Sequence, residues 1–231
     1  MELQKLKCGR LEPLGGILFA ALLAGVGFLI LRVAPAEKTM GEVQRIVYVH
    51  VAVATFGMFG MLLAAAAGLA LLVRRDQGWD HWGRAAAEVG WLCSTLTLIT
   101  GSLWAHEAWN TWWTWEPRLT SSLILWTIYA GYFLLRSSID NDRQQARVCA
   151  ILAIVGALDI PIITMATRWF RGMHPVSPEM DPTMRGVLLA SMVSLTCFFA
   201  YLLVRRSVQL QMGHRIRALR QRLLFEQGVR M

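Results

Sequence analysis

Charged residues are scarce in this chain. Asp, Glu, Lys and Arg make up 16% of its 231 residues, whereas soluble domains carry roughly a quarter. Hydrophobic residues make up 55%, and long runs without charge recur. Each run is close to the roughly 20 residues that a helix needs to cross a hydrocarbon core of about 30 Å. The composition therefore predicts an all-α, polytopic membrane protein rather than a soluble domain.

Several catalytic motifs are also absent. The sequence has no GxxxxGK[ST] motif for ATP hydrolysis through a P-loop, no CxxCH for covalent haem attachment, and neither GxSxG nor HExxH. The four cysteines form no CxxC pair, and three of them fall within apolar runs, which is typical of small buried hydrophobic residues. We therefore predict a component that is not itself an enzyme.

The apolar runs predict six membrane-spanning helices. The first run, Leu14–Ala34, is too long for the apolar region of a cleavable signal peptide, so we expect it to remain as the first span. The spans are predicted at 14–34, 46–73, 85–104, 118–135, 147–166 and 184–204. They form one membrane domain, 14–204, between an N-terminal segment, 1–13, and a tail, 205–231.

Lys and Arg predict the orientation of these spans. The N-terminus, the second and fourth connections and the tail together hold 16 of the 23 basic residues, and such segments face the cytoplasm. Both termini are therefore expected to be cytoplasmic. The tail contains RIRALRQRLLF, a basic amphipathic stretch whose expected partner is the anionic surface of the lipid bilayer. The net charge of +8 lies mainly in these cytoplasmic segments, which favours binding to lipid over binding to nucleic acid.

Tryptophan is unusually concentrated on the predicted outer face. Six of the ten tryptophans lie between Trp104 and Trp126, and the connection between spans three and four reads WNTWWTWEPRLT. Trp109, Trp112, Trp113 and Glu116 follow the i, i+3, i+4, i+7 spacing of one helical face, which predicts a short interfacial helix. Pro117 suits the first position of span four. An aromatic belt explains single tryptophans, but belts are spread over many span ends.

Two histidines are predicted at the same face. His50 lies about one turn inside span two, where an ionisable side chain is a functional candidate, although a neutral imidazole bonded to a neighbouring helix is an equal alternative. His174 lies in the connection between spans five and six. Two imidazoles on one face, together with aromatic residues, fit the two axial positions of a haem iron.

Haem explains the neighbouring residues better than zinc does. A porphyrin offers a flat apolar surface to indole rings, and its two propionates need cations. A zinc site remains an alternative, with His106, Glu107 and Glu116 as further ligands, but it gives no reason for the tryptophans. The candidate haem platform comprises Trp104, Trp109, Trp112, Trp113, Trp115 and Glu116. The candidate propionate partners are Arg45, Arg118, Arg168 and Arg171.

Asp159 is the remaining polar candidate in a span. It precedes Pro161, and a proline inside a span frees a backbone carbonyl that neighbouring groups must satisfy. Asp159 could therefore orient an imidazole from the second shell of ligands, or it could mark a helix kink.

Four segments, in this order and spacing, resemble the haem exporter protein C (CcmC) family of cytochrome c maturation. They read RIVYVHVAVA, TGSLWAHEAWNTWWTWEPRLTSSLILW, DIPIITMATRWFRGMH and MDPTMR. The resemblance covers nearly the whole chain, and the Trp-rich signature is shared with a wider superfamily of haem-handling proteins. The chain departs from the family pattern at Asn110, Glu116 and Pro117, where the family usually has Gly, Asp and Ala.

The resemblance implies a multi-pass protein of the bacterial inner membrane, with six spans and a periplasmic Trp-rich segment. It implies that haem b is held by His50 and His174, and that it is delivered to a periplasmic haem chaperone (CcmE). It further implies association with ABC transporter subunits (CcmA and CcmB) and a small one-span subunit (CcmD).

Two other functions are weighed against haem delivery. An electron-transfer subunit of the cytochrome b type usually stacks two haems across the bilayer and needs four intramembrane histidines. Only His50 of the five histidines lies in a predicted span, which disfavours that function. A membrane scaffold for the transporter would bind no haem and would tolerate loss of the tryptophans.

Overall fold

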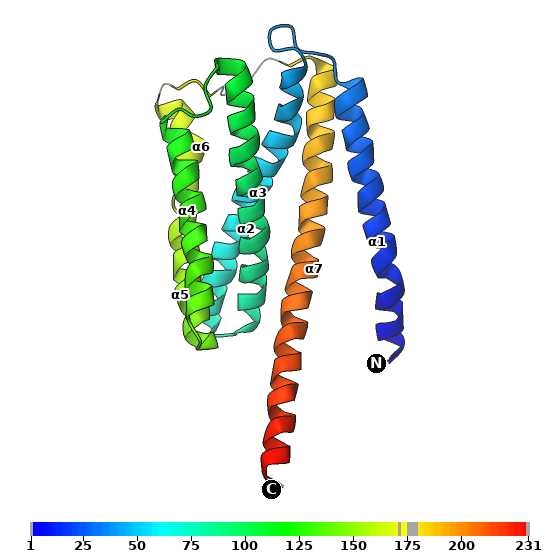
Figure 1. Ribbon diagram of the computed structural model, residues 1–231, viewed down its shortest axis with the longest axis vertical. Helices are drawn as coiled ribbons and strands as arrows, with labels where there is room; N and C mark the ends of the chain where they lie inside the picture. The colour runs from blue at the N-terminus through cyan, green and yellow to red at the C-terminus, as the bar shows by residue number, and fades with distance from the viewer. Residues whose placement is uncertain (1, 171, 175–179, 230–231) are drawn as a thin grey trace.

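The protein is a bundle of long helices, as the computed structural model shows for residues 2–170, 172–174 and 180–229 (Figure 1). The helices run along one common axis, and the chain ends N and C lie at the end of the bundle opposite the α3–α4 connection. The elements are α1 (Glu2–Phe28), the π-helical turn η1 (Leu29–Val33), the 3-10 turn η2 (Glu42–Gln44), α2 (Arg45–Arg74), α3 (Gly78–Trp109), α4 (Pro117–Ser138), α5 (Asp142–Ala157), α6 (Ile160–Trp169) and α7 (Pro182–Val229).

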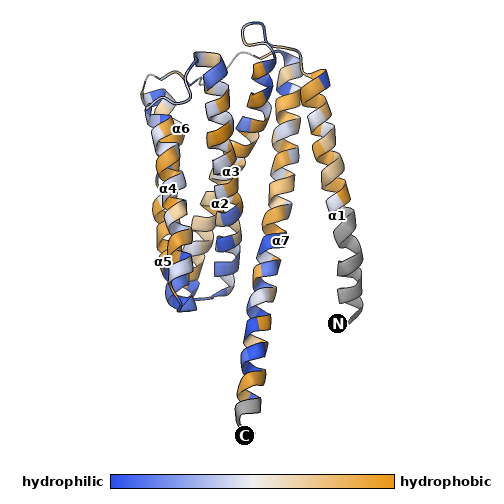
Figure 2. Ribbon diagram, in the orientation of Figure 1, coloured by the Kyte–Doolittle hydropathy of each residue, from blue (hydrophilic) through white to orange (hydrophobic). Residues whose placement is uncertain are grey.

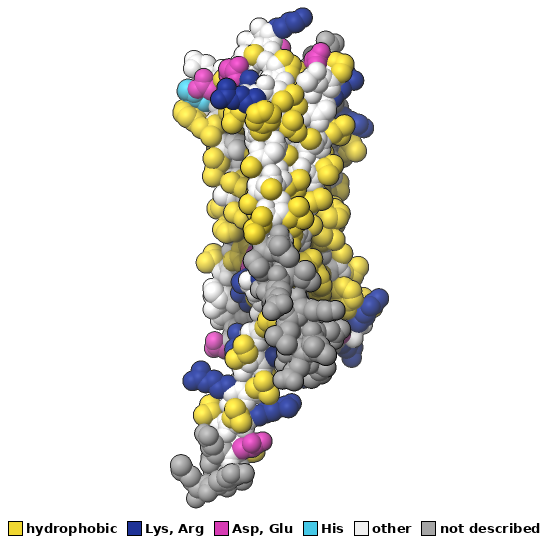
Figure 3. Space-filling view, turned by 90° about the vertical axis from the view of Figure 1, so that its right-hand side faces the viewer, with side chains coloured by type: hydrophobic (Ala, Val, Ile, Leu, Met, Phe, Trp, Pro, Cys, Tyr) yellow, Lys and Arg dark blue, Asp and Glu magenta, His cyan; other side chains and the backbone are white. Residues whose placement is uncertain are grey.

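Four segments of the described chain are long and apolar enough to cross a membrane. They are Gly15–Val33, Glu42–Arg74, Asp142–Trp169 and Pro182–Glu226. Apolar residues dominate the middle of the bundle in Figure 2, and in Figure 3 an apolar band separates two ends at which charged side chains gather. This pattern supports a polytopic membrane protein. Helices α3 and α4 lie in the same bundle, and their crossing of the membrane stays a prediction.

The predicted spans agree with the helices, with two differences in detail. The fifth span is divided, because α5 ends at Ala157 and α6 begins at Ile160, just before Pro161. This break is the kink that proline predicts at Asp159. The helix that carries the sixth predicted span, 184–204, is longer than that span, since α7 continues through the basic tail to Val229.

Small residues allow α2 to approach its neighbours closely. A Cβ atom on Gly60 would lie 3.0 Å from the Cα atom of Gly90 on α3, and one on Gly68 would lie 3.1 Å from the Cα atom of Ala150 on α5. Helices associate in membranes largely through such close packing of small residues. Helix α2 therefore holds a central position between α3 and α5.

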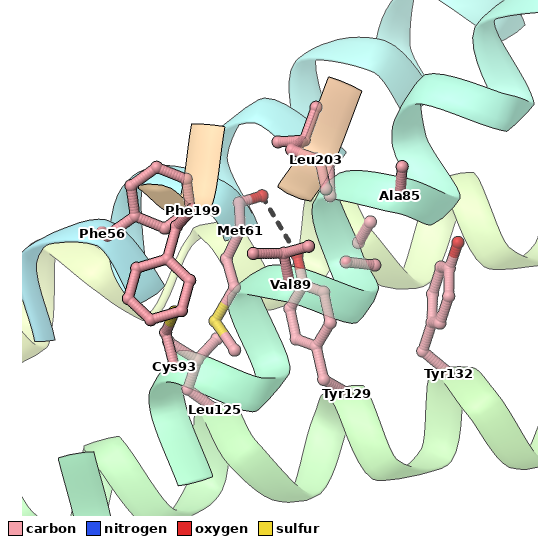
Figure 4. Packing of buried hydrophobic residues seen from close by; sticks show 14 of the residues in the cluster. Phe56, Met61, Ala85, Val89, Cys93, Leu125, Tyr129, Tyr132, Phe199 and Leu203 are labelled. Atoms are coloured by element: carbon pink, nitrogen blue, oxygen red, sulfur yellow. Dashed lines mark hydrogen bonds between the residues drawn. The ribbon is translucent and has the colours of Figure 1, made fainter. Parts of the chain in front are cut away.

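Large side chains fill the space around these contacts (Figure 4). Phe56 of α2 packs against Phe199 of α7 with ring centroids 5.4 Å apart. The hydroxyl of Tyr129, which is fully buried on α4, donates a hydrogen bond to the carbonyl of Met61 (3.0 Å). This bond satisfies the one polar atom of an otherwise apolar contact between α2 and α4.

The cysteines follow the sequence prediction only in part. Cys93 and Cys149 are buried, as predicted for small hydrophobic residues, whereas Cys197 is exposed. The prediction was wrong for Cys197 because an apolar residue of a membrane span can face outward toward lipid as well as inward.

Ion pairs fasten the helices at the end of the bundle that holds the chain termini. The buried guanidinium of Arg136 on α4 pairs with the carboxylate of Asp80 on α3, with Nη1 3.2 Å from Oδ2. Arg206 of α7 pairs with Glu88 of α3, and Glu88 also accepts a hydrogen bond from Arg84 (2.9 Å). Helix α3 is thus fixed to both α4 and α7.

Candidate functional site

The Trp-rich segment joins α3 to α4 without a helix of its own. Helix α3 ends at Trp109, and Asn110 adopts the left-handed conformation (φ 53°, ψ 35°), with its N–H bonded to the carbonyl of His106 (2.9 Å). Asn and Gly tolerate this conformation best, which accounts for Asn at a position where Gly is usual. The short helix predicted from the Trp109–Glu116 spacing is therefore wrong.

Pro117 fixes the other end of this segment. Glu116 is extended (φ −71°, ψ 154°), as expected for a residue before proline, and Pro117 begins α4, as predicted. The segment between Asn110 and Glu116 is thus irregular because residues at both of its ends leave helical geometry. Its side chains are positioned by the ends of α3 and α4.

The aromatic rings of this region form several contacts. Trp104 and Trp109 meet edge to face with centroids 4.9 Å apart, and the imidazole of His106 stacks on Trp112 at 4.1 Å. Trp112 and Trp115 present much of their surface outward, with 57% and 76% exposed. The cluster therefore offers both a packed inner layer and an exposed outer layer of indoles.

His50 is oriented by Thr100, a residue that the sequence analysis did not identify. The Nδ1 atom of His50 on α2 lies 3.0 Å from the Oγ1 atom of Thr100 on α3. The single hydroxyl proton of Thr100 is directed at the Leu96 carbonyl (2.7 Å), so Thr100 accepts at its contact with the ring. With this assignment of the Thr100 proton, His50 carries its own proton on Nδ1 and leaves the lone pair of Nε2 for a metal. This is the tautomer that a metal-binding imidazole needs.

Gly101 provides the space for this imidazole. A Cβ atom at Gly101 would lie 3.0 Å from the Cε1 atom of His50 and 3.6 Å from Nδ1. Any larger residue would push the ring away, so glycine at this position lets α3 pass close beside His50.

The structure brings three of the predicted residues together from three elements. His174, in the connection between α6 and α7, and Arg118, at the start of α4, are both close enough to His50 for their charges to interact with its imidazole. Glu116 extends this group, because its Oε2 atom accepts a hydrogen bond from the backbone N–H of Met173 (2.8 Å). The Trp-rich segment and the His174 connection are thereby joined.

Other candidates are less directly placed. Arg45 pairs with Glu42 and donates to the carbonyl of Ile30, and Arg168 is exposed in the last turn of α6. Arg171 lies outside the described residues. Pairing of Arg45, Arg168 and Arg171 with the haem propionates stays a prediction.

Asp159 marks the break between α5 and α6. Its Oδ2 atom is buried and has no hydrogen-bond partner in the described part of the chain. The kink is therefore observed, while an orienting role for Asp159 stays a prediction.

The alternative of a zinc site gains no support. Over residues 2–170, 172–174 and 180–229, no group of three or more His, Cys, Asp or Glu side chains is arranged to hold a metal ion. A mononuclear zinc site needs three or four such ligands.

Several buried polar atoms near the Trp-rich segment have no partner among the residues that the structure describes. They are Nε1 of Trp104 and Trp113, Oγ1 of Thr114 and Thr120, and Oε1 of Glu116. Native structures leave few buried polar groups unsatisfied, and ordered water or a ligand usually accounts for those that remain. A bound group with hydrogen-bonding edges, such as a porphyrin with its propionates, fits these atoms.

Comparison with known proteins identifies the family. The sequence profile of the family described as heme exporter protein C matches residues 4–222. Heme exporter protein C of Bradyrhizobium diazoefficiens is 34% identical over 188 residues, which cover 78% of this chain and 72% of that protein. The Escherichia coli K12 protein of the same name is 33% identical over 186 residues (79% and 74%), and that of Haemophilus influenzae is 34% identical over 206 residues (87% and 82%). With this coverage and identity, the chain belongs to the heme exporter protein C family.

Proposed function

We propose that this protein holds haem at the outer face of the bacterial inner membrane and presents it to a periplasmic haem chaperone (CcmE) during cytochrome c maturation. Membership of the heme exporter protein C family supports a role in haem export. The observation that carries the finer proposal is that His174 and Arg118 both lie within electrostatic reach of His50.

In this proposal the two imidazoles bind the iron from opposite faces of the porphyrin. His50 would bind through Nε2, because its Nδ1 is occupied by Thr100. Two axial histidines fill the coordination sphere and thereby suppress binding of O₂. Arg118 would pair with a propionate, and the partly buried tryptophans would cover the apolar ring surface.

The two histidines come from different kinds of element, a helix and a connection. His50 projects from the central helix α2 and contacts α3. His174 lies in the connection between α6 and α7, where its neighbour Met173 donates a backbone hydrogen bond to Glu116 of the Trp-rich segment.

The protein acts in this proposal as a transport component rather than as an enzyme. If the chain has the six spans and cytoplasmic termini that its apolar runs and basic residues predict, the site faces the periplasm, where CcmE would meet the exposed Trp112 and Trp115. The energy of ATP would come from the partner subunits CcmA and CcmB, with the small subunit CcmD in the same complex. The haem is expected to be haem b, since the sequence has no CxxCH motif.

Transfer of haem to the purified soluble domain of CcmE tests this function. Trp112→Leu/Trp115→Leu is expected to slow transfer roughly tenfold, because each aromatic ring stacked on a tryptophan contributes about 1 kcal/mol. The control is Trp82→Leu, which changes an exposed tryptophan at the opposite end of the bundle. Equal transfer by both variants, or steady reduction of the bound haem by quinol at turnover rates, would instead favour a scaffold or an electron-transfer subunit.

A further inference from the structure

A cavity lies at the end of the bundle opposite the Trp-rich segment. It has a volume of about 460 Å³ and opens between the α2–α3 connection, the first turns of α3 and the extended part of α7. Four basic side chains and two indoles line most of it: Arg74, His81, His214, Arg215, Trp79 and Trp82. Nothing in the proposed haem function uses these residues.

The lining of this cavity carries a net positive charge, because two arginines, Arg74 and Arg215, stand against one carboxylate, Asp76. The rings of His81 and His214 lie 5.5 Å apart, and the guanidinium of Arg74 lies over the ring of Trp79 at 5.3 Å. In the described part of the chain, neither Arg74 nor Arg215 has a carboxylate within ion-pair distance. Uncompensated cations gathered around a cavity favour an anionic ligand.

The acidic residue of the cavity, Asp76, offsets one of the two arginine charges and leaves the other. Asp76 lies in the α2–α3 turn, where its Oδ1 atom accepts a hydrogen bond from the backbone N–H of Gly78 (2.8 Å). Burial lowers the pKa of His81, and the positive charges of His214, Arg136 and Arg84 lower it further, against the opposite effect of Asp80. The lowered pKa favours the neutral form of His81, so the positive charge of the cavity comes from its arginines.

The position of α7 in this cavity is fixed by the ion pair between Arg206 and Glu88. His81 lies two turns before Glu88 on α3, and His214 lies about two turns after Arg206 on α7. Because the two helices run in opposite directions, this pair sets the register that brings the two histidine rings next to each other, at a tilt of 55°. The cavity is therefore built by interhelical contacts, unlike a run of basic residues on an isolated tail.

We propose that this cavity binds a single phosphate-bearing anion, either the headgroup of an anionic phospholipid or a soluble phosphate. Arginine binds phosphate oxygens through two parallel N–H donors, and protonated or neutral histidines add further donors. Trp79 and Trp82 match the indoles that anchor proteins at the level of lipid headgroups. Exposed apolar side chains beside the cavity, Val73, Met212 and Ile216, provide a surface for acyl chains.

Binding to the full-length protein in lipid-free detergent solution tests the proposal. The probes are short-chain phosphatidylglycerol, short-chain phosphatidylcholine and inorganic phosphate, with bound ligand counted by native mass spectrometry. The test variant is Arg74→Gln/Arg215→Gln, in which both residues are exposed and their loss breaks no buried contact. The matched control, Arg75→Gln/Arg217→Gln, removes the same charge from neighbouring positions that do not line the cavity.

We expect one phosphatidylglycerol to bind saturably to the wild type and the control, and roughly tenfold more weakly to the test variant. Phosphatidylcholine should bind more weakly, because its choline group is repelled by the cavity. Inorganic phosphate that shows the same variant dependence, with no preference between the two lipids, would identify a soluble phosphate as the source. Equal loss in both variants would indicate diffuse surface charge and overturn the proposal, as would the absence of saturable binding.

Discussion

The carboxylate of Glu116 accepts a hydrogen bond from the backbone N–H of Met173 (2.8 Å), one residue before His174. A side chain of the Trp-rich segment therefore fixes the connection that carries the second histidine. Gly172 leaves room for this approach, since a Cβ atom there would collide with the Glu116 carboxylate. The family usually has Asp at position 116, and the extra methylene of Glu lets the carboxylate reach this backbone while Pro117 begins α4.

Removal of this carboxylate should loosen the His174 connection. We expect Glu116→Ala to weaken haem binding roughly tenfold, because a hydrogen bond to a charged group contributes about 1.5–3 kcal/mol. Glu116→Gln keeps an acceptor oxygen, so its haem affinity should lie between those of the wild type and Glu116→Ala. Haem affinity of the purified protein measures the effect, with Glu107→Ala, a more exposed carboxylate at the same end, as control. Identical affinities for Glu116→Ala and Glu107→Ala would refute this role.

The orientation of His50 should depend on the hydroxyl of Thr100. Thr100→Val keeps the shape but removes the acceptor, and loss of such a partner typically weakens metal binding by about 10–100-fold. Thr100→Ser should restore most of the affinity. Thr127→Val is the matched control, because the Thr127 hydroxyl makes the same type of bond within α4, to the Leu123 carbonyl (2.8 Å). The role of Thr100 is refuted if the Thr100→Val and Thr100→Ser variants bind haem with the same affinity.

Gly101 should be intolerant of even one methyl group. Gly101→Ala places its Cβ atom 3.0 Å from Cε1 of His50, so the ring must move by a few tenths of an ångström. We expect the helix to stay folded and the low-spin fraction of bound haem to fall several-fold in the optical spectrum. Gly131→Ala adds the same methyl group to α4 in open space and should leave the spectrum unchanged. A normal spectrum for Gly101→Ala would show that the imidazole has room to move.

The buried ion pair between Asp80 and Arg136 should contribute strongly to the stability of the bundle at the end opposite the Trp-rich segment. The Arg136 side chain is 5% exposed, and removal of its partner leaves an uncompensated charge that costs about 3–5 kcal/mol. We expect Asp80→Ala to lower the thermal midpoint in detergent by on the order of 10 °C. Asp140→Ala, in the exposed α4–α5 connection, should change it little. A change of the same size in both variants would mean that the pair contributes no specific stability.

Local sequence signals predicted the helices and their interruptions well. Apolar runs located the helical segments, and the prolines at 117 and 161 located the start of α4 and the break between α5 and α6. The same signals failed between Trp109 and Glu116, where helical spacing continues although Asn110 has already left helical geometry. Spacing shows only which residues would share a face if a helix formed. The left-handed backbone of Asn110 ends the helix before that face can form.

The residues that orient His50 could not be found from the sequence. Thr100 and Gly101 matter because α3 packs against α2 in one particular register, and that register depends on contacts such as the one between Gly60 and Gly90. A threonine and a glycine within an apolar run carry no sign of such a role by themselves. The family resemblance, in contrast, was confirmed over residues 4–222.

The most direct test of the account is the optical spectrum of the purified protein, with wild type beside His50→Ala and His174→Ala. The account predicts a sharp six-coordinate, low-spin haem spectrum for wild type, which either single substitution abolishes. Trp82→Leu, at the far end of the bundle, should leave the spectrum unchanged. If the His50→Ala/His174→Ala double variant purifies with as much haem and the same low-spin spectrum as wild type, the proposed ligands are wrong.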